Sequence, residues 1–299
     1  MEFRQFRYFL IAAEELHFTR AARRLNIAQP ALSQQIRQME EELGTLLFHR
    51  LTRGVELTDA GHAFLPFARA LMVTSEAGIS AAKRAAKGEL GQLRIGFTGS
   101  ASFNPIVTRT IGRFREAYSD VELVLQENAT TSLLKMLGDN QIQLAFLRST
   151  EDEMRDLRKT RLPDEALWAA VPTSHPLARQ GCVALAALSE QRFVLYPRSN
   201  GRLLYDTIIA ACGQAGFSPL IVQEAPQMTS TINLVAAGVG VTLVPESMQQ
   251  IQSPKVTYLR LTDPEPRTSL TLVQGQDLLM TAVVRNFIRC LEETKQEQA

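Results

Sequence analysis

Residues 18–50 read FTRAARRLNIAQPALSQQIRQMEEELGTLLFHR, and this stretch decides how the N-terminal part of the chain folds. Apolar residues at helical spacing predict a short helix over Arg20–Leu25, which Thr19 can cap or open. A turn at 26–28 separates it from a second helix, which carries Pro30 in its first turn and runs to about Leu43. Two short helices joined by a tight turn predict a helix-turn-helix, whose second helix docks in the major groove of DNA.

The second of these helices has one apolar and one polar face. Amide, hydroxyl and guanidinium groups, which read base edges, gather on the polar face. We therefore expect DNA contacts from this helix, from the start of the helix before it, and from two arginines that follow. These candidates are Thr19, Arg20, Gln29, Pro30, Ser33, Gln34, Arg37, Arg50 and Arg53.

The flanking segments complete a winged helix-turn-helix over residues 1–58. Phe3, Phe6 and Phe9 recur at helical spacing, which predicts an amphipathic helix over 2–14. Residues 46–50 and 55–58 flank Leu51-Thr-Arg-Gly54 and predict a two-stranded wing. Arg53, near the tip of that wing, is positioned for a phosphate or a narrow minor groove.

Charge in this segment is segregated by sign. Residues 1–58 hold eight arginines and no lysine, and residues 18–39 carry four of these arginines and no carboxylate. A solvated helix face is the alternative interpretation of such a run. The exclusive use of arginine favours nucleic acid, because a planar guanidinium matches phosphates and guanine edges.

Composition limits the other classes of protein. A chain of 299 residues predicts about two domains, and 45% hydrophobic residues exclude bulk disorder. The longest apolar stretch, 234–245, is too short to span a bilayer, and the N-terminus lacks an apolar signal core, so we expect a cytoplasmic protein without a membrane partner. Three cysteines and four scattered histidines predict neither a disulfide framework nor a metal site.

Residues 59–90 predict a long connecting helix and a hinge. From Asp59 to about Ala86 the chain is rich in Ala and Leu, and Lys87–Gly91 then breaks the pattern. A helix of this length with an exposed apolar seam needs a partner, so we expect antiparallel packing against a second copy. A core helix of a larger domain is the alternative. A dimer would present two recognition helices and read an interrupted inverted repeat.

Beyond Gly91 the chain alternates between strands and helices, which predicts an α/β domain over 91–299 with parallel sheets in two lobes. Ligands of such sheets bind at the carboxyl ends of strands. The stretch Gly96-Phe-Thr-Gly-Ser-Ala-Ser102 leaves a strand and enters a helix, a suitable place for a small anion. The expected pocket residues are Thr98, Gly99, Ser100, Ala101, Ser102, Thr130, Arg148, Asn200, Gly201, Arg202 and Met228.

The N-terminal motifs resemble those of the LysR-type transcriptional regulators. The match runs unbroken over some sixty residues, through Phe18–Leu25, Gln29–Ile36, Leu43–Arg50 and Arg53–Gly61. There are two departures: Ala28 stands where the family usually has Ser or Thr, which removes about 1 kcal/mol of helix capping, and Gln34 replaces a basic residue, which shifts the expected base preference from guanine toward adenine.

The resemblance implies the rest of the architecture. It predicts a domain similar to periplasmic binding proteins, with lobe I at about 91–162 and 268–299 and lobe II at about 163–267. Crossovers would lie near 161–167 and 264–268. It further implies no cofactor, a small aromatic or short-chain organic acid as co-inducer in the cleft, a homodimer that pairs into a homotetramer, and RNA polymerase as a candidate partner.

Two rival classes of protein and two weaker signals compete with this interpretation. An enzyme would need a nucleophile elbow, a metal set or a cofactor loop, and none is found; a solute-binding module would show no salt-dependent DNA affinity. Gly238-Val-Gly240 is half of a dinucleotide fingerprint but precedes its strand, so we read it as a turn. Cys182 and Cys212 lack the basic neighbours that a redox-sensing thiol requires.

Overall fold

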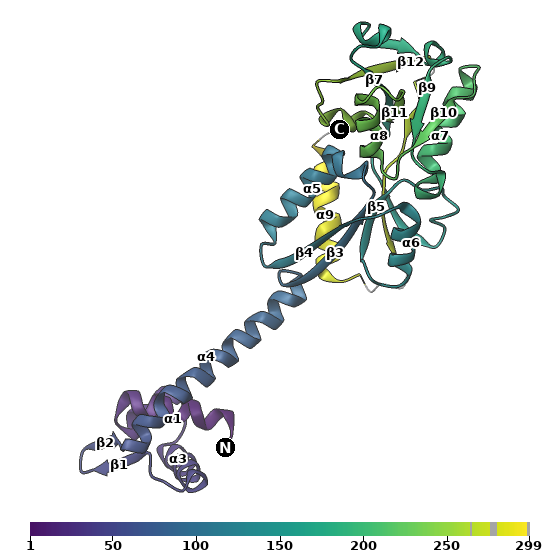
Figure 1. Cartoon of the computed structure of the whole chain (residues 1–299). Helices are drawn as coiled ribbons and strands as arrows, with labels where there is room; N and C mark the ends of the chain where they lie inside the picture. Colours follow the sequence, from purple (N-terminus) through teal and green to yellow (C-terminus); the bar gives the residue numbers. More distant parts are fainter. Residues whose placement is uncertain (264, 276–279, 298–299) are drawn as a thin grey trace. The chain divides into compact units, whose positions relative to one another are not determined.

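The structure is a computed structural model that describes residues 1–263, 265–275 and 280–297 (Figure 1). The chain divides into two compact units, Met1–Arg84 and Ala85–Ala299. The sequence predicted a separate segment for residues 59–90, whereas the helix residues up to Arg84 belong to the first unit.

The first unit is a three-helix bundle followed by a hairpin and a long helix. Its elements are α1 (Phe3–Glu15), α2 (Phe18–Leu25), α3 (Gln29–Leu43), β1 (Phe48–Leu51), β2 (Gly54–Leu57) and α4 (Asp59–Lys87), the last of which ends in the second unit. Thr19, expected to cap or open α2, lies within its first turn and is not the cap. His17 occupies the N-cap, and its Nδ1 accepts a hydrogen bond of 3.2 Å from the Thr19 backbone N–H. The helix starts earlier than predicted because Phe18 is buried against Phe48.

An aromatic cluster holds this unit together. Phe9 is fully buried and contacts the rings of Phe48 and Phe64 at centroid distances of 5.4 and 5.2 Å. The core thereby joins α1, the wing and the start of α4. The hairpin closes at Gly54, whose φ of +100° favours glycine, and the Val55 N–H donates to the Leu16 carbonyl. The wing is thus packed onto the helices.

The second unit contains a lobe built on a five-stranded sheet of order β4-β3-β5-β14-β6. Its strands are β3 (Gly91–Phe97), β4 (Val121–Glu127), β5 (Leu144–Leu147), β6 (Leu157–Arg161) and β14 (Thr271–Gly275). Helices α5 (Pro105–Ala117) and α9 (Ala282–Gln296) lie side by side in Figure 1, where Phe114 meets Phe287 at 5.3 Å between ring centroids. Helix α6 (Thr130–Gly138) packs with Ala145 and Leu147, which alternate with Phe146 on β5.

The other lobe combines a mixed five-stranded sheet of order β11-β7-β12-β8, with β13 beside β7, a two-stranded sheet of β9 and β10, and two further helices. Its strands are β7 (Glu165–Pro172), β8 (Cys182–Ala184), β9 (Arg192–Leu195), β10 (Leu220–Glu224), β11 (Thr242–Pro245), β12 (Val256–Thr262) and β13 (Arg267–Thr268). Its helices are α7 (Arg202–Gln214) and α8 (Met228–Ala236). Short 3-10 turns η1 to η5 cover 101–103, 176–179, 185–188, 198–200 and 246–250.

The expectation of purely parallel sheets is wrong. Strands β3, β4 and β5 pair in parallel, but β14 is antiparallel to both β5 and β6. In the other lobe β7 pairs antiparallel with β11, β12 and β13. Strand β14 re-enters its sheet after the chain has built the second lobe, so no helical crossover forces it into parallel pairing.

Two strands carry the chain between the lobes. The first passage lies between β6 and β7, within the predicted crossover at 161–167. On the return, Arg267 and Thr268 pair with Ala166 and Glu165 before β14 begins, so the two passages run side by side. Pro264, the predicted start of that return, lies outside the described residues. Glu165 consequently stands at the junction of the lobes.

Candidate DNA interface and effector pocket

Helix α3 presents a polar face whose first turn lacks a side-chain cap. Ala28 is its N-cap and makes no capping bond, as the sequence predicted, and Pro30 lies in the first turn. The side chains of Gln29, Gln34 and Arg37 are exposed. Uncapped N–H groups at a helix N-terminus attract anions, so this end suits a phosphate.

Ser33 does not lie open on that face, and this corrects the prediction. It is only 7% exposed, and its hydroxyl accepts a hydrogen bond of 2.8 Å from the Gln29 amide. In this structure Ser33 therefore orients Gln29. Leu32, Ser33 and Ile36 are all buried on the side of α3 that faces the bundle. The next residue after Ser33, Gln34, is exposed.

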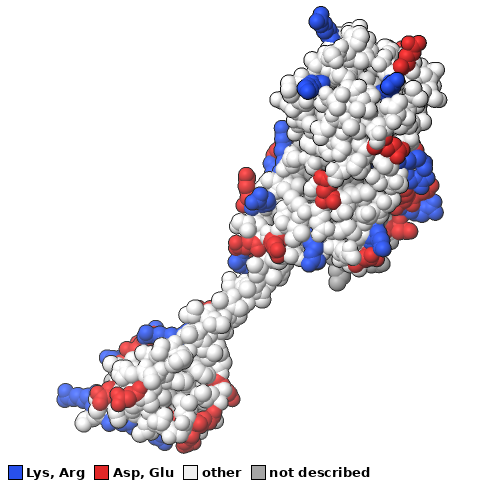
Figure 2. Space-filling view, in the orientation of Figure 1, with Lys and Arg blue, Asp and Glu red and all other residues white. Residues whose placement is uncertain are grey.

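The remaining DNA candidates differ in whether their side chains already have partners within the protein. Thr19 and Pro30 are exposed, while the Arg20 guanidinium bonds to the carbonyl and carboxylate of Glu15. The Arg50 guanidinium lies 5.8 Å from the centre of the Phe18 ring, a cation–π distance. Arg53 is exposed between the wing strands, and within the described residues it has no ion-pair partner. Figure 2 shows basic side chains at the wing end of this unit.

Glu40, which the sequence did not single out, fixes the wing to α3. It is 7% exposed, and its Oε1 accepts hydrogen bonds from the backbone N–H groups of Leu47 (2.8 Å) and Phe48 (3.1 Å). The carboxylate thus holds the turn that leads from α3 into β1. A buried glutamate near a helix end is visible in sequence only as one of three adjacent acids at 40–42.

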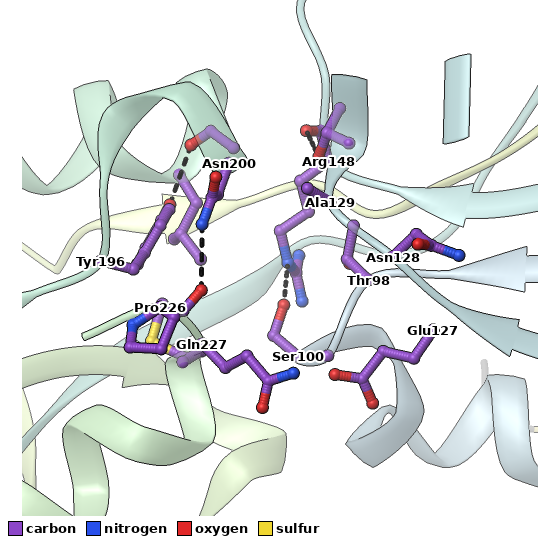
Figure 3. Close-up of a pocket in the computed structure, with 15 residues that line it drawn as sticks. Thr98, Ser100, Glu127, Asn128, Ala129, Arg148, Tyr196, Asn200, Pro226 and Gln227 are labelled. Carbon is purple, nitrogen blue, oxygen red and sulfur yellow. Dashed lines mark hydrogen bonds between the residues drawn. The ribbon is translucent and has the colours of Figure 1, made fainter. Parts of the chain in front are cut away.

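The second unit holds a cavity of about 310 Å³ between its lobes (Figure 3). Loops after strands of both lobes line it. The lining residues are Thr98, Gly99, Ser100, Glu127, Asn128, Ala129, Thr130, Arg148, Tyr196, Asn200, Gly201, Leu204, Pro226, Gln227 and Met228. Such loops are where ligands of open α/β sheets bind.

Three helices direct uncapped N-termini toward this cavity. The N-cap residues of α6, α7 and α8 are Ala129, Gly201 and Gln227, and none makes a side-chain capping bond. All three line the cavity. The loops are braced, since the Tyr196 hydroxyl donates to the Gly201 carbonyl at 2.9 Å and the Asn200 amide donates to the Pro226 carbonyl at 2.9 Å. Partial positive charge from three helix dipoles therefore converges on one space.

Arg148 provides a buried cationic group in the wall of the cavity. It is 3% exposed, pairs with Glu165, and its Nε lies 3.4 Å from the Ser100 hydroxyl. Its Nη1 is buried and, within the described residues, has no hydrogen-bond partner. The Thr98 hydroxyl is in the same state. Buried polar groups are normally satisfied, so two unsatisfied groups on one wall suit an absent ligand.

Glu165 anchors the Arg148 side chain from the junction of the lobes. Burial raises the pKa of this carboxyl, but the charge of Arg148 and hydrogen bonds from Ser247 and Asn104 outweigh it, so the pKa lies below its usual value. Its Oε1 accepts from the Asn104 amide at 3.3 Å, and its Oε2 accepts from the Ser247 backbone N–H at 3.3 Å. These contacts tie both lobes to one carboxylate.

The structure brings most, but not all, of the predicted pocket residues together. Thr98, Gly99, Ser100, Thr130, Arg148, Asn200, Gly201 and Met228 line the cavity. Ala101 is instead fully buried in the core, Ser102 donates to the Gly99 carbonyl at 2.7 Å, and Arg202 is half-exposed and pairs with Glu153 at 3.6 Å. These three residues are not among those that line the cavity: Ala101 and Ser102 lie in η1, and Arg202 is the first residue of α7.

Other polar centres give no sign of separate chemistry. Within the described residues, no group of His, Cys, Asp and Glu could hold a metal ion, and no helix is long and apolar enough to cross a membrane. All three cysteines are free. Burial raises the pKa of Cys212 to about 11, the opposite of what a reactive thiolate needs.

Comparisons with known proteins agree with this architecture. Residues 3–62 match the model of the bacterial regulatory helix-turn-helix protein of the lysR family, and residues 86–296 match the LysR substrate binding domain. The transcriptional regulator YnfL of Escherichia coli (strain K12) is 37% identical over 287 residues, 96% of each chain. BudR of Raoultella terrigena is 36% identical over 272 residues, covering 91% of this chain and 94% of that one.

A solved structure extends the match to the whole chain. Full-length CbnR complexed with its target DNA has a TM-score of 0.87 and 25% identity, covering 99% of this chain and 100% of that one. These relatives are DNA-binding regulators rather than enzymes. The chain belongs to the LysR family of transcriptional regulators, with a helix-turn-helix for DNA and a substrate-binding domain for an effector.

Proposed function

We propose that this regulator responds to a small organic acid, an aromatic or short-chain carboxylate, bound in the cavity of the second unit. The carboxylate would meet the N-termini of α6, α7 and α8 together with the hydroxyls of Ser100 and Thr130. The observation that carries this proposal is the unsatisfied Arg148 Nη1, buried on the wall toward which those three helices converge.

The same proposal assigns the DNA contacts to α3 and the wing. Gln29, Gln34 and Arg37 would read base edges, and Arg53 would enter the minor groove. The regulator would exist in two conformations, and the acid would favour the one that it binds more tightly. The size of that shift is set by the difference between the two affinities. In this proposal the regulator works in the bacterial cytoplasm, where the chromosome lies, and RNA polymerase is the partner that reads out the change.

The oligomer in this proposal is a homodimer through α4, paired into a homotetramer. Large apolar side chains on α4 are open to solvent: Phe67 is 73% exposed, Val73 66% and Ile79 54%. On the face of α4 that Figure 2 shows, almost no charged side chain is visible. The exposed Leu125 on β4 and Leu220 on β10, both on edge strands, offer a second apolar contact. Two copies would read an interrupted inverted repeat.

A panel of carboxylates added to the full-length protein tests the effector claim. An acid that binds should raise the unfolding temperature of the second unit, and Ser100→Ala should weaken that binding about tenfold, because a charged ligand loses a hydroxyl donor. Thr108→Ala, on the exposed side of α5, is the control. Equal stabilisation of the wild type and Ser100→Ala by every acid would contradict the site.

The oligomer is tested separately by Phe67→Ser. Replacing an exposed apolar side chain should leave the fold unchanged and shift the protein toward monomers in sedimentation. An unchanged distribution of species would remove α4 from the interface.

A further inference from the structure

The cavity carries a carboxylate that the binding of a simple acid does not explain. Glu127, at the end of β4, lines the cavity with its side chain exposed, and within the described residues it has no hydrogen bond or ion pair. Figure 3 shows this carboxylate and the Gln227 amide directed toward each other across the cavity. A plain anion in the cavity would therefore share it with a carboxylate that has no partner within the described residues.

The backbone next to Glu127 makes room for it. A β-carbon at Gly99 would lie 2.9 Å from Glu127 Oε1, closer than such contacts occur, so a side chain at position 99 would displace the carboxylate. Gly99 belongs to the loop that also supplies Thr98 and Ser100. The loop thus places the Glu127 carboxylate, a hydrogen-bond acceptor, beside two hydroxyls that can donate to an anion.

The basic side of the cavity does not offset this acidic group. Arg148 is the single basic side chain among the described lining residues, and Glu165 already pairs with it. What remains for an anion is the helix N-termini, the unsatisfied Nη1 of Arg148 and neutral donors. The cavity therefore presents hydrogen-bond donors together with a carboxylate acceptor.

We infer that the effector carries a hydrogen-bond donor beside its carboxylate, an ammonium group by preference and a hydroxyl next, and that Glu127 selects it. This inference rests on the proposed function and narrows its ligand class to amino and hydroxy acids. A charge-assisted bond from an ammonium group to Glu127 is stronger than one from a hydroxyl. An unsubstituted acid leaves Glu127 without a donor, and a dicarboxylate brings a second negative charge toward it.

Matched acids test the inference on the full-length protein. Two series share a carbon skeleton and differ in one group: alanine, lactate and propionate, and phenylglycine, mandelate and phenylacetate. Calorimetric affinities should rank amino above hydroxy above unsubstituted acid in at least one series, with about a tenfold or greater preference for amino over unsubstituted acid. Glu127→Gln should bring that ratio near one, and Glu116→Gln, exposed on α5, should leave it unchanged.

The possible outcomes distinguish a failure of the role inferred for Glu127 from a failure of the proposed acid site. Tighter binding of unsubstituted acids by the wild type, or an amino preference that survives in Glu127→Gln, overturns the role of Glu127 while the acid site stands. Binding by no acid in either series contradicts the acid site itself. Because Glu127 is exposed, its substitution should not alter the unfolding temperature without ligand.

Discussion

The DNA interface and the effector cavity are built in opposite ways. The interface comes from one continuous segment, and the side chains proposed to read DNA, those of Gln34, Arg37 and Arg53, are exposed. The cavity takes its lining from loops far apart in sequence, and its central residue Arg148 is 3% exposed. Substitution in the interface should therefore change binding while sparing the fold, whereas substitution of a buried cavity residue such as Arg148 should change both.

Arg148→Met should give the largest effect. It leaves Glu165 buried without its cation, so the free energy of unfolding of the second unit should fall by about 3–5 kcal/mol. Urea denaturation followed by circular dichroism measures this loss. Arg202→Met removes a half-exposed pair and should cost less than about 1 kcal/mol. Equal losses of unfolding free energy in the two variants would contradict the difference expected between a buried and a half-exposed ion pair.

The same pair should make the second unit sensitive to acid. The folded-state pKa of Glu165 lies below its ordinary value of 4.5, so its stabilising effect is complete above pH 4.5 and is lost as the pH falls through the folded pKa. Glu165→Gln should accordingly lower stability at neutral pH and flatten its decline in acid. Thermal unfolding across pH compares the two proteins. Parallel curves would mean that another carboxyl controls the acid response.

Gln34→Ala tests the interface as a reader of sequence. The side chain is exposed on α3, so operator affinity should fall by about 1–3 kcal/mol while random DNA is bound as before. Fluorescence anisotropy with both DNAs gives the two affinities. Gln141→Ala, exposed in the second unit, is the control. A matching loss on random DNA would show that Gln34 contacts the backbone instead.

Arg53→Ala should give the smallest and least selective effect. Loss of one phosphate or minor-groove cation should weaken all DNA sequences alike and reduce the slope of log affinity against log salt by about one. Titrations at several salt concentrations measure that slope. An unchanged slope would mean that the wing tip does not touch the duplex.

The contrast also explains what the sequence could predict. The helix-turn-helix follows from spacing within one segment, so its helices, wing and uncapped Ala28 were all predictable. Ser33 was misjudged because one step of rotation on α3 separates a buried from an exposed side chain. Glu40 was missed because its partners are backbone N–H groups, which no side-chain pattern reveals.

The cavity was predictable only in part, since its residues meet through long-range packing. Loops after strands gave Thr98, Ser100 and Thr130, because the ends of parallel strands share an edge. Glu165 could not be assigned from sequence, as its role depends on the return of β13 beside β7. The antiparallel entry of β14 was likewise hidden, because strand direction is set by topology rather than by local composition.

Footprinting of the promoter DNA beside the regulator's own gene tests most directly whether cavity and interface act together. We predict protection of an interrupted inverted repeat that changes in extent when the acid is added, with Ser100→Ala needing about ten times more acid for the same change. Protection that stays the same with and without an acid known to bind the cavity would contradict it.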